Sequence, residues 1–178
     1  LNSETAITGG NGMSMAINSD SSISAWGANN YGQLGDDTNI NKKLPVAVKY
    51  VAGADYLGGV TSAVTSPSGS HTVALKNDGT VWGWGLNANG QLGDNTIASR
   101  SVPVQIKDST GNAYLSGITA IAVGSNYSLA LKNDGTVWGW GNNSAGQLGD
   151  NTTTQRLLPT QVRDLSGAAY LINITAIS

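Results

Sequence analysis

The chain contains no cysteine, a single histidine and few charged residues, and each of these shortages narrows its possible functions. Without cysteine there are neither disulfide bonds nor thiolate metal ligands, so the composition fits an oxidising or a reducing compartment. Charged residues make up 11% of the chain, and the net charge is -2. A nucleic-acid-binding surface needs clustered excess lysine and arginine. We therefore expect no nucleic-acid partner.

Long hydrophobic runs are also missing. No stretch approaches the ~20 apolar residues that cross a bilayer, and no signal peptide is visible, so we expect no membrane insertion. The chain begins at Leu1 rather than methionine, which predicts a processed form or a piece of a longer protein. Serine, threonine, asparagine and glycine are abundant, whereas lysine and glutamate are scarce. This composition favours an extracellular or cell-surface location.

One motif is present three times. It reads AWGANNYGQLGDD at 25–37, GWGLNANGQLGDN at 83–95 and GWGNNSAGQLGDN at 139–151, with a period of about 57 residues. Such a period is typical of a solenoid, a propeller or an array, in which each repeat packs on its neighbours. We therefore predict a single repeat domain over 1–178, with repeats at about 5–60, 61–117 and 118–173, and a further repeat beginning at 174–178.

The third repeat shows how one unit is built. Short segments of β-branched, aromatic or alternating apolar residues lie between turn sequences, including an Asn-Asp-Gly hairpin turn at 133–135. They predict four antiparallel strands at 118–124, 127–132, 136–141 and 158–162. Four strands per repeat are typical of a propeller blade. The predicted fold class is therefore all-β, with β-propeller blades of four antiparallel strands.

Large and small residues alternate along the third strand of this repeat. Trp138 and Trp140 lie on one face, and Gly139 and Gly141 lie on the other. Because neither face carries charge, both should be covered, and we expect the indoles of one blade to pack over the glycine-lined face of the next. The equivalent tryptophans of the motif are accordingly expected in the core rather than in a sugar-binding set.

The motif W-G-x-N-x-x-G-Q-L-G, preceded by L-K-N-D-G-T-V-W, resembles the repeat of the regulator of chromosome condensation family. It stands at 26–35, 84–93 and 140–149, and the pattern extends over nearly the whole chain. The resemblance implies a β-propeller, usually of seven blades. It also implies diverse functions: nucleotide exchange on a small GTPase, chromatin contact, and inhibition of other proteins by secreted bacterial members. No segment matches the inserted loops that carry those activities, so no functional residue is carried over.

Three blades do not close a ring, because propellers have about 4–8 blades. We therefore expect a partial propeller, or part of a larger or oligomeric ring. Further blades in a longer chain, two chains in a six-bladed ring, and arcs stacked into a filament are the alternatives. The segment 174–178 copies the start of the strand at 118–122, and 5–8 is the N-terminal version. This predicts an array that continues, or a strand donated to a neighbouring copy.

Basic residues recur at two positions of the repeat. The first set is Lys42, Arg100 and Arg156, and the second is Lys49, Lys107 and Arg163. In an arc each set forms a row along one rim. Such a row is either a basic stripe for an acidic partner or a solvated rim whose periodicity was inherited from duplication.

Other polar residues of the repeats are expected to be structural. The aspartates after G-Q-L-G lack the D-x-D-x-D-G spacing of a calcium loop, so each is expected to hydrogen-bond its own loop backbone; they are Asp36, Asp94 and Asp150. The single histidine, His71, aligns with Met13 and Tyr127 and is expected to be packed or on the rim. We predict no catalytic residue, no metal site and no cofactor.

Positions that differ between repeats are the ones that the architecture leaves unexplained. They cluster in the loops at 37–43, 95–101 and 151–157. Tyr31 and Tyr50 have no aromatic equivalent in the second repeat, and loop aromatics are typical interface anchors. Together with the six basic residues, they are the candidate partner-binding residues.

These observations favour a non-enzymatic protein-interaction scaffold, secreted or surface-exposed, whose partner is another protein or copies of itself. One alternative is a structural subunit of an extracellular filament or array, assembled by blade stacking. Another is a carbohydrate-binding module that uses loop aromatics and asparagines. Regulation of a GTPase rests on family analogy alone, and analogy of fold does not establish it.

Overall fold

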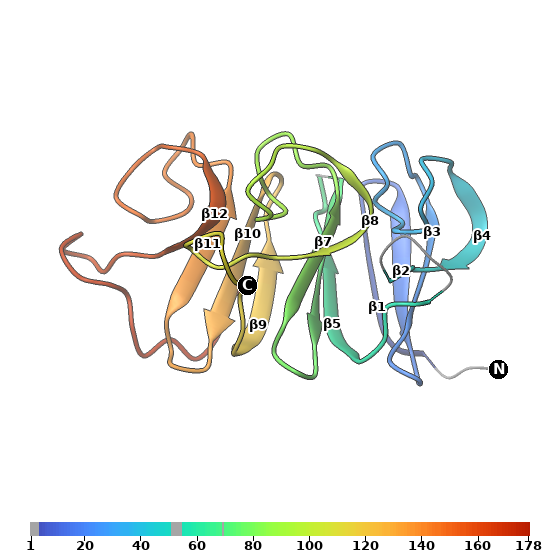
Figure 1. The fold of residues 1–178 in the computed structure, drawn as a ribbon, viewed down its shortest axis with the longest axis horizontal. Coiled ribbons are helices and arrows are strands. Elements are labelled where there is room, and N and C mark those ends of the chain that lie inside the picture. Colours follow the sequence, from blue (N-terminus) through green and yellow to red (C-terminus); the bar gives the residue numbers. More distant parts are fainter. Residues whose placement is uncertain (1–3, 51–54, 69) are drawn as a thin grey trace.

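The computed structural model describes residues 4–50, 55–68 and 70–178. Over these ranges the chain contains strands and no helix, so no helix able to span a membrane is present in them. The strands form three four-stranded antiparallel sheets that stand side by side as blades (Figure 1). In each blade the strands pair in chain order, as in a meander.

The strand bounds follow the sequence repeat. Blade 1 consists of β1 (Glu4–Gly10), β2 (Met13–Asn18), β3 (Ile23–Gly27) and β4 (Lys42–Ala47). Blade 2 consists of β5 (Val60–Thr65), β6 (His71–Lys76), β7 (Val81–Gly85) and β8 (Arg100–Gln105). Blade 3 consists of β9 (Ile118–Val123), β10 (Tyr127–Lys132), β11 (Val137–Gly141) and β12 (Arg156–Gln161). The predicted all-β class with four-stranded antiparallel blades is confirmed, and the sheets do not close into a ring.

The hairpin between β6 and β7 illustrates why the local sequence folds as it does. Gly79 has φ of 75°, a conformation that a side chain disfavours. The carboxylate of Asp78 accepts hydrogen bonds from the N–H (3.0 Å) and the hydroxyl (2.6 Å) of Thr80. The same turn joins β10 to β11 at Asp134. Residues 174–178, which copy the start of β9, form no strand.

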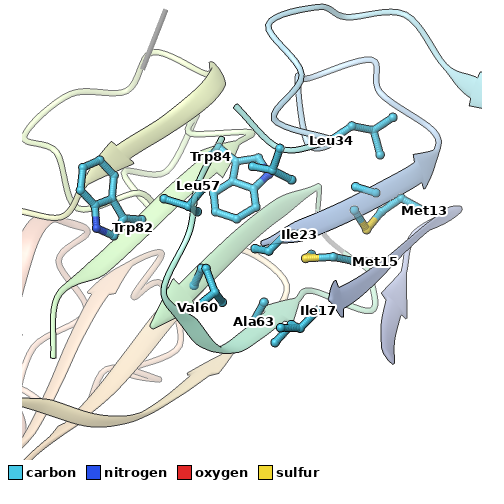
Figure 2. Packing of buried hydrophobic residues seen from close by; sticks show 13 residues of the cluster. Met13, Met15, Ile17, Ile23, Leu34, Leu57, Val60, Ala63, Trp82 and Trp84 are labelled. Atoms are coloured by element: carbon cyan, nitrogen blue, oxygen red, sulfur yellow. The ribbon is translucent and has the colours of Figure 1, made fainter. Parts of the chain in front are cut away.

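The hydrophobic core lies between blades rather than within one sheet. The first strands of successive blades, β1, β5 and β9, lie next to one another. One cluster fills the space between blades 1 and 2, with Met15 and Ile23 from blade 1 and Trp84 from blade 2 all buried (Figure 2). A second cluster, around Val73 and Trp140, joins blades 2 and 3. Each blade is therefore stabilised chiefly by its neighbours.

The contact predicted between indoles and strand glycines is wrong. Trp84 packs instead on the G-Q-L-G loop of the preceding blade, where a β-carbon added to Gly35 would lie 3.0 Å from the indole Nε1. The strand glycine Gly83 faces Leu92, in the loop of its own blade. The strand glycines thus make room for the blade's own loop, whereas the loop glycine makes room for the neighbour's indole.

Candidate partner-binding groove

The first set of predicted basic residues lies at the start of the outer strands β4, β8 and β12. Each of these residues forms an ion pair with the aspartate that follows G-Q-L-G in its own blade. The N–O distances are 3.0 Å for Lys42–Asp36, 2.6 Å for Arg100–Asp94 and 2.6 Å for Arg156–Asp150. These basic side chains are therefore paired within their own blades. The sequence analysis named both the basic residues and the aspartates but did not predict that they pair.

Each of these three aspartates accepts hydrogen bonds from several residues of its own long loop. Asp94 accepts hydrogen bonds from Asn87 Nδ2 (3.1 Å), Thr96 N (3.0 Å) and Arg100 Nε (2.9 Å). Burial raises the pKa of Asp94, but the hydrogen bonds from Thr96 and Arg100 outweigh it, so the pKa lies below its ordinary value. The carboxylates of the other two blades behave alike. The predicted bond from each aspartate to its own loop backbone is confirmed.

The second set of basic residues follows the outer strands. Each one forms a main-chain bridge with a tyrosine: Lys49 with Tyr56, Lys107 with Tyr114, and Arg163 with Tyr170. The guanidinium of Arg163 also lies 4.4 Å from the ring centroid of its tyrosine, within cation–π range. Sequence analysis missed these tyrosines, although their recurrence before a leucine, once per repeat, is the signal that marks them.

Blade 2 carries a groove of about 550 Å³, which we call the outer groove. It brings together three of the predicted residues, Tyr50, Arg100 and Lys107, and adds two that were missed, Trp82 and Tyr114. The rest of its lining consists of Asp94, Thr96, Val102, Pro103, Val104 and Gln105.

Aromatic and charged groups lie close together at the outer groove. The rings of Tyr50 and Trp82 lie 5.2 Å apart at 52°, and Lys76 Nζ lies 5.9 Å from each ring centroid. Arg100 is neutralised by its ion pair, whereas Lys107 has no ion pair within the described residues. The groove is therefore apolar and aromatic with one uncompensated positive charge.

The edge of β8 beside the groove is protected against strand addition. Pro103 interrupts the main-chain donors of this outer strand, and prolines of edge strands are a common protection against edge-to-edge pairing. Pro45 and Pro159 stand at the same place in β4 and β12. Extension of the sheet at this edge is accordingly disfavoured.

The corresponding positions of the other two blades differ from those of blade 2. In blade 3 the corresponding space is about 230 Å³ and brings Arg156 and Arg163 together with Trp138, but Ser109 lines it from the preceding blade in place of a tyrosine. In blade 1, Ser24 stands where Trp82 stands, and Lys42 and Lys49 line neither of these two grooves. Of the predicted tyrosines, Tyr31 lies apart on an exposed loop.

His71 is packed between blades 2 and 3. Its Nε2 lies 3.1 Å from Ser128 Oγ, and that hydroxyl donates its proton to the carbonyl of Gln91 at 2.9 Å. Because a hydroxyl has only one proton, Nε2 must be the donor of the first bond. A histidine that activates a serine would have to accept this proton. Both side chains are fully buried, so the pair is structural.

The described ranges hold no group of three acidic or histidine side chains close enough to bind a metal ion. Three four-stranded blades that share interfaces of one design define a β-propeller repeat protein. The sequence model of the Regulator of chromosome condensation (RCC1) repeat matches residues 22–75, 78–131 and 134–178, and a second model of that repeat matches 118–147. The chain belongs to the RCC1 repeat family.

Curated relatives share the repeats within much longer proteins. The probable E3 ubiquitin-protein ligase HERC6 of Homo sapiens is 33% identical over 162 residues, which are 90% of this chain and 15% of HERC6. The probable E3 ubiquitin-protein ligase HERC4 of Homo sapiens is 33% identical over 156 residues, 87% of this chain and 14% of HERC4. The chain thus spans only a small part of the relatives that it matches.

Solved structures share the blade arrangement. Human WBSCR16 superposes with a TM-score of 0.73 at 23% identity, over 92% of this chain and 40% of that protein. Prp20p from Saccharomyces cerevisiae, described with its binding to Gsp1p and histones, gives a TM-score of 0.73 at 17% identity, over 92% of this chain and 39% of that protein. These likenesses show the fold.

Proposed function

We propose that the chain is a non-enzymatic protein-interaction scaffold and that the outer groove of blade 2 holds its partner. The observation that carries the proposal is the convergence of Tyr50, Trp82 and Lys107 in one groove. Aromatic side chains are typical anchors of protein-binding surfaces, and a charge beside them adds electrostatic selectivity. The binding of Gsp1p and histones described for Prp20p supports the use of this fold in protein recognition.

The chemistry of the groove defines the kind of partner. Tyr50 and Tyr114 offer exposed ring surface to an apolar or aromatic side chain, and Lys107 attracts a carboxylate. Because Pro103 discourages strand addition, the partner is held by its side chains. The partner that fits is an exposed, extended protein segment in which an aromatic residue lies close to an acidic one.

Display of a peptide library against the immobilised chain tests this proposal. We expect selected peptides to combine an aromatic and an acidic residue, with affinity measured by fluorescence polarisation. Lys107→Glu should weaken binding about tenfold, because it replaces an attraction by a repulsion. A peptide in which the acidic residue is changed to lysine should regain affinity for Lys107→Glu.

Blade 1 supplies the matched control. Lys49 stands at the equivalent position but does not line the outer groove, so Lys49→Glu should leave binding unchanged. Tyr50→Ala should weaken binding, because it removes one of the aromatic rings that line the groove. A library that yields no binder would overturn the proposal. So would binders that respond to Lys49→Glu as strongly as to Lys107→Glu.

Two finer expectations remain predictions. An extracellular or cell-surface location is supported by the composition alone, and immunodetection in fractionated source cells tests it. A glycan ligand could not stack on Trp84 or Trp140, which are fully buried, so it would use more exposed rings such as Tyr50. Binding to a glycan array that is lost in Tyr50→Ala would replace the protein partner by a carbohydrate.

A further inference from the structure

Blade 3 carries a smaller groove, which we call the arginine groove and define by Ser109, Trp138, Arg156, Arg163 and Tyr170. Its volume is about 230 Å³, against about 550 Å³ for the outer groove. Both grooves are built alike: each is lined by a strand tryptophan, by the basic residue of the ion pair, and by the basic residue and the tyrosine that follow the outer strand. The two grooves are therefore equivalent positions of consecutive blades.

A groove of this kind is formed by one blade and the connections on either side of it. The outer groove takes Tyr50 from the connection before blade 2 and Tyr114 from the connection after it, and no strand of blade 3 lines it. In blade 3, Ser109 and Tyr170 come from the corresponding two connections. The arginine groove therefore needs no residue beyond blade 3 and its own connections.

Arg163 provides the uncompensated charge of the arginine groove. Arg156 is neutralised by the ion pair within its own blade. Arg163 forms no ion pair within the described residues, and its guanidinium lies over the ring of Tyr170. The neighbouring carboxylate of Asp164 accepts hydrogen bonds from the N–H (3.1 Å) and the hydroxyl (2.6 Å) of Ser166, so it is engaged in its own turn. The groove therefore offers one guanidinium to a ligand.

The chemistry of Arg163 favours a carboxylate. A guanidinium that lies over an aromatic ring keeps the N–H groups of its edge free, and its planar fork matches the two oxygens of a carboxylate. Because contact with Tyr170 already restricts the side chain, less conformational freedom is lost on binding. The outer groove has Lys107 at this position, beside three aromatic rings. The smaller arginine groove thus suits an acidic side chain without an aromatic partner.

The two grooves lie on either side of one short segment of the chain. Lys107 lines the outer groove and Ser109 lines the arginine groove, and two residues of extended chain span only ~7 Å. Between them, the carboxylate of Asp108 accepts hydrogen bonds from the N–H (3.1 Å) and the hydroxyl (2.7 Å) of Thr110, so it is engaged in the turn. One extended segment of a partner can therefore reach both grooves.

We propose that the arginine groove is a second subsite for the partner of the outer groove, with Arg163 binding a carboxylate of the same segment. The partner then carries the aromatic and acidic pair that occupies the outer groove and a further acidic residue at a fixed spacing from it. This inference rests on the proposed function, because it adds a second anchor to the partner described there. Two linked contacts raise affinity most when the spacer matches the span between the sites.

Extended peptides test the second subsite. A peptide selected for the outer groove is lengthened at either end by a glycine-serine spacer of ~2 to ~10 residues that ends in a pair of glutamates. Fluorescence polarisation should show binding about tenfold tighter at one end and one spacer length, relative to the same spacer ending in a pair of glutamines. If no spacer at either end tightened binding, the second subsite would be overturned.

Charge reversal assigns the gain to Arg163. Arg163→Glu should abolish it while leaving the affinity of the unextended peptide unchanged, which also shows that the variant is folded. A spacer that ends in lysines should tighten binding to Arg163→Glu. Lys43→Glu is the matched control, because it makes the same change of net charge at an exposed residue of blade 1 that lines neither groove. Loss of the gain in both variants alike would overturn the proposal.

The indole N–H signals in nuclear magnetic resonance spectra locate each contact. Trp82 lines the outer groove and Trp138 lines the arginine groove, so their signals, assigned with Trp82→Phe and Trp138→Phe, report on the two grooves separately. The unextended peptide should shift the signal of Trp82 alone, and the extended peptide should shift both.

The two proposals fail in different ways. An extended peptide that leaves the signal of Trp138 unshifted would overturn the second subsite and leave the proposed function standing. If Lys107→Glu did not weaken binding of the unextended peptide, the proposed function itself would be wrong.

Discussion

His71 shows how one buried group makes stability depend on pH. Its Nε2 is bonded to Ser128, its Nδ1 is buried without a hydrogen-bond partner, and no carboxylate is bonded to it. Burial lowers its pKa from 6.5 to about 4, and the nearby main chain of Tyr127 acts more weakly in the opposite sense. The imidazole is therefore neutral in the folded chain at pH values where the unfolded chain would protonate it.

We predict that stability falls as the pH falls from about 6.5 to about 4. In this window the unfolded chain binds a proton at His71 and the folded chain does not, so acid favours unfolding. The shift corresponds to about 3 kcal/mol of unfolding free energy, lost by pH 4 and fully present above pH 6.5. Urea unfolding at several pH values measures it.

His71→Met supplies the control for this prediction, because Met13 fills the equivalent position of blade 1. The variant should show a much flatter pH profile between 4 and 6.5. If the unfolding free energy of His71→Met depended on pH as steeply as that of the unchanged chain, a group other than His71 would cause the pH dependence.

Asp94 holds its loop together through more bonds than any other carboxylate of blade 2. Asp94→Asn turns an acceptor oxygen into a donor that faces Arg100 or Asn87, and should lower the unfolding free energy by about 2 kcal/mol. Asp78→Asn is the matched control, because Asp78 makes the same turn bonds to Thr80 at an exposed site. Thermal unfolding should show a clearly larger fall in Tm for Asp94→Asn. Equal falls would contradict a special role for the loop.

At the scale of elements, the G-Q-L-G loop joins consecutive blades. Its glutamine carbonyl and its last glycine receive the tryptophan of the following blade, while its aspartate pairs with the outer strand of its own blade. One loop therefore fixes both the internal shape of a blade and its distance from the next. This explains why the motif repeats with so few changes.

The tryptophans of β11 test this role. Trp140→Phe removes the bond to the Gln91 carbonyl and part of a fully buried ring, and should lower the unfolding free energy by about 2 kcal/mol. Trp138→Phe removes a bond to Thr136 at a half-exposed site and should lower it by less than half as much. Denaturant unfolding measures both. A larger loss in Trp138→Phe would contradict the loop's role in joining blades.

The strands and blades were predictable from sequence because turn chemistry and alternation act locally. The hairpin at Asp134 and the bounds of β10 follow from residues that are neighbours in the chain. Partners across interfaces were not predictable in the same way, and the tryptophans were assigned to the wrong glycines. The outer groove needs Tyr50 and Trp82, which come from different blades and meet only in the folded arc.

At the scale of the molecule, sequence repeats and blades are out of phase. The repeat at 78–131 supplies β7 and β8 to blade 2, and β9 and nearly all of β10 to blade 3. The repeats at 22–75 and 78–131 therefore each bridge an interface, which links neighbouring blades covalently as well as by packing. Repeat assemblies are stabilised by such nearest-neighbour contacts, so a blade with two neighbours should be the most stable.

Hydrogen exchange at low concentration tests this expectation. Every residue of β7 is buried, whereas β3 and β11, its equivalents in the end blades, each contain half-buried residues. We predict the slowest amide exchange in β6 and β7 and faster exchange in β2, β3, β10 and β11, because an end blade can open while breaking only one interface. Uniform protection in dilute samples would mean that the three blades unfold only as one unit.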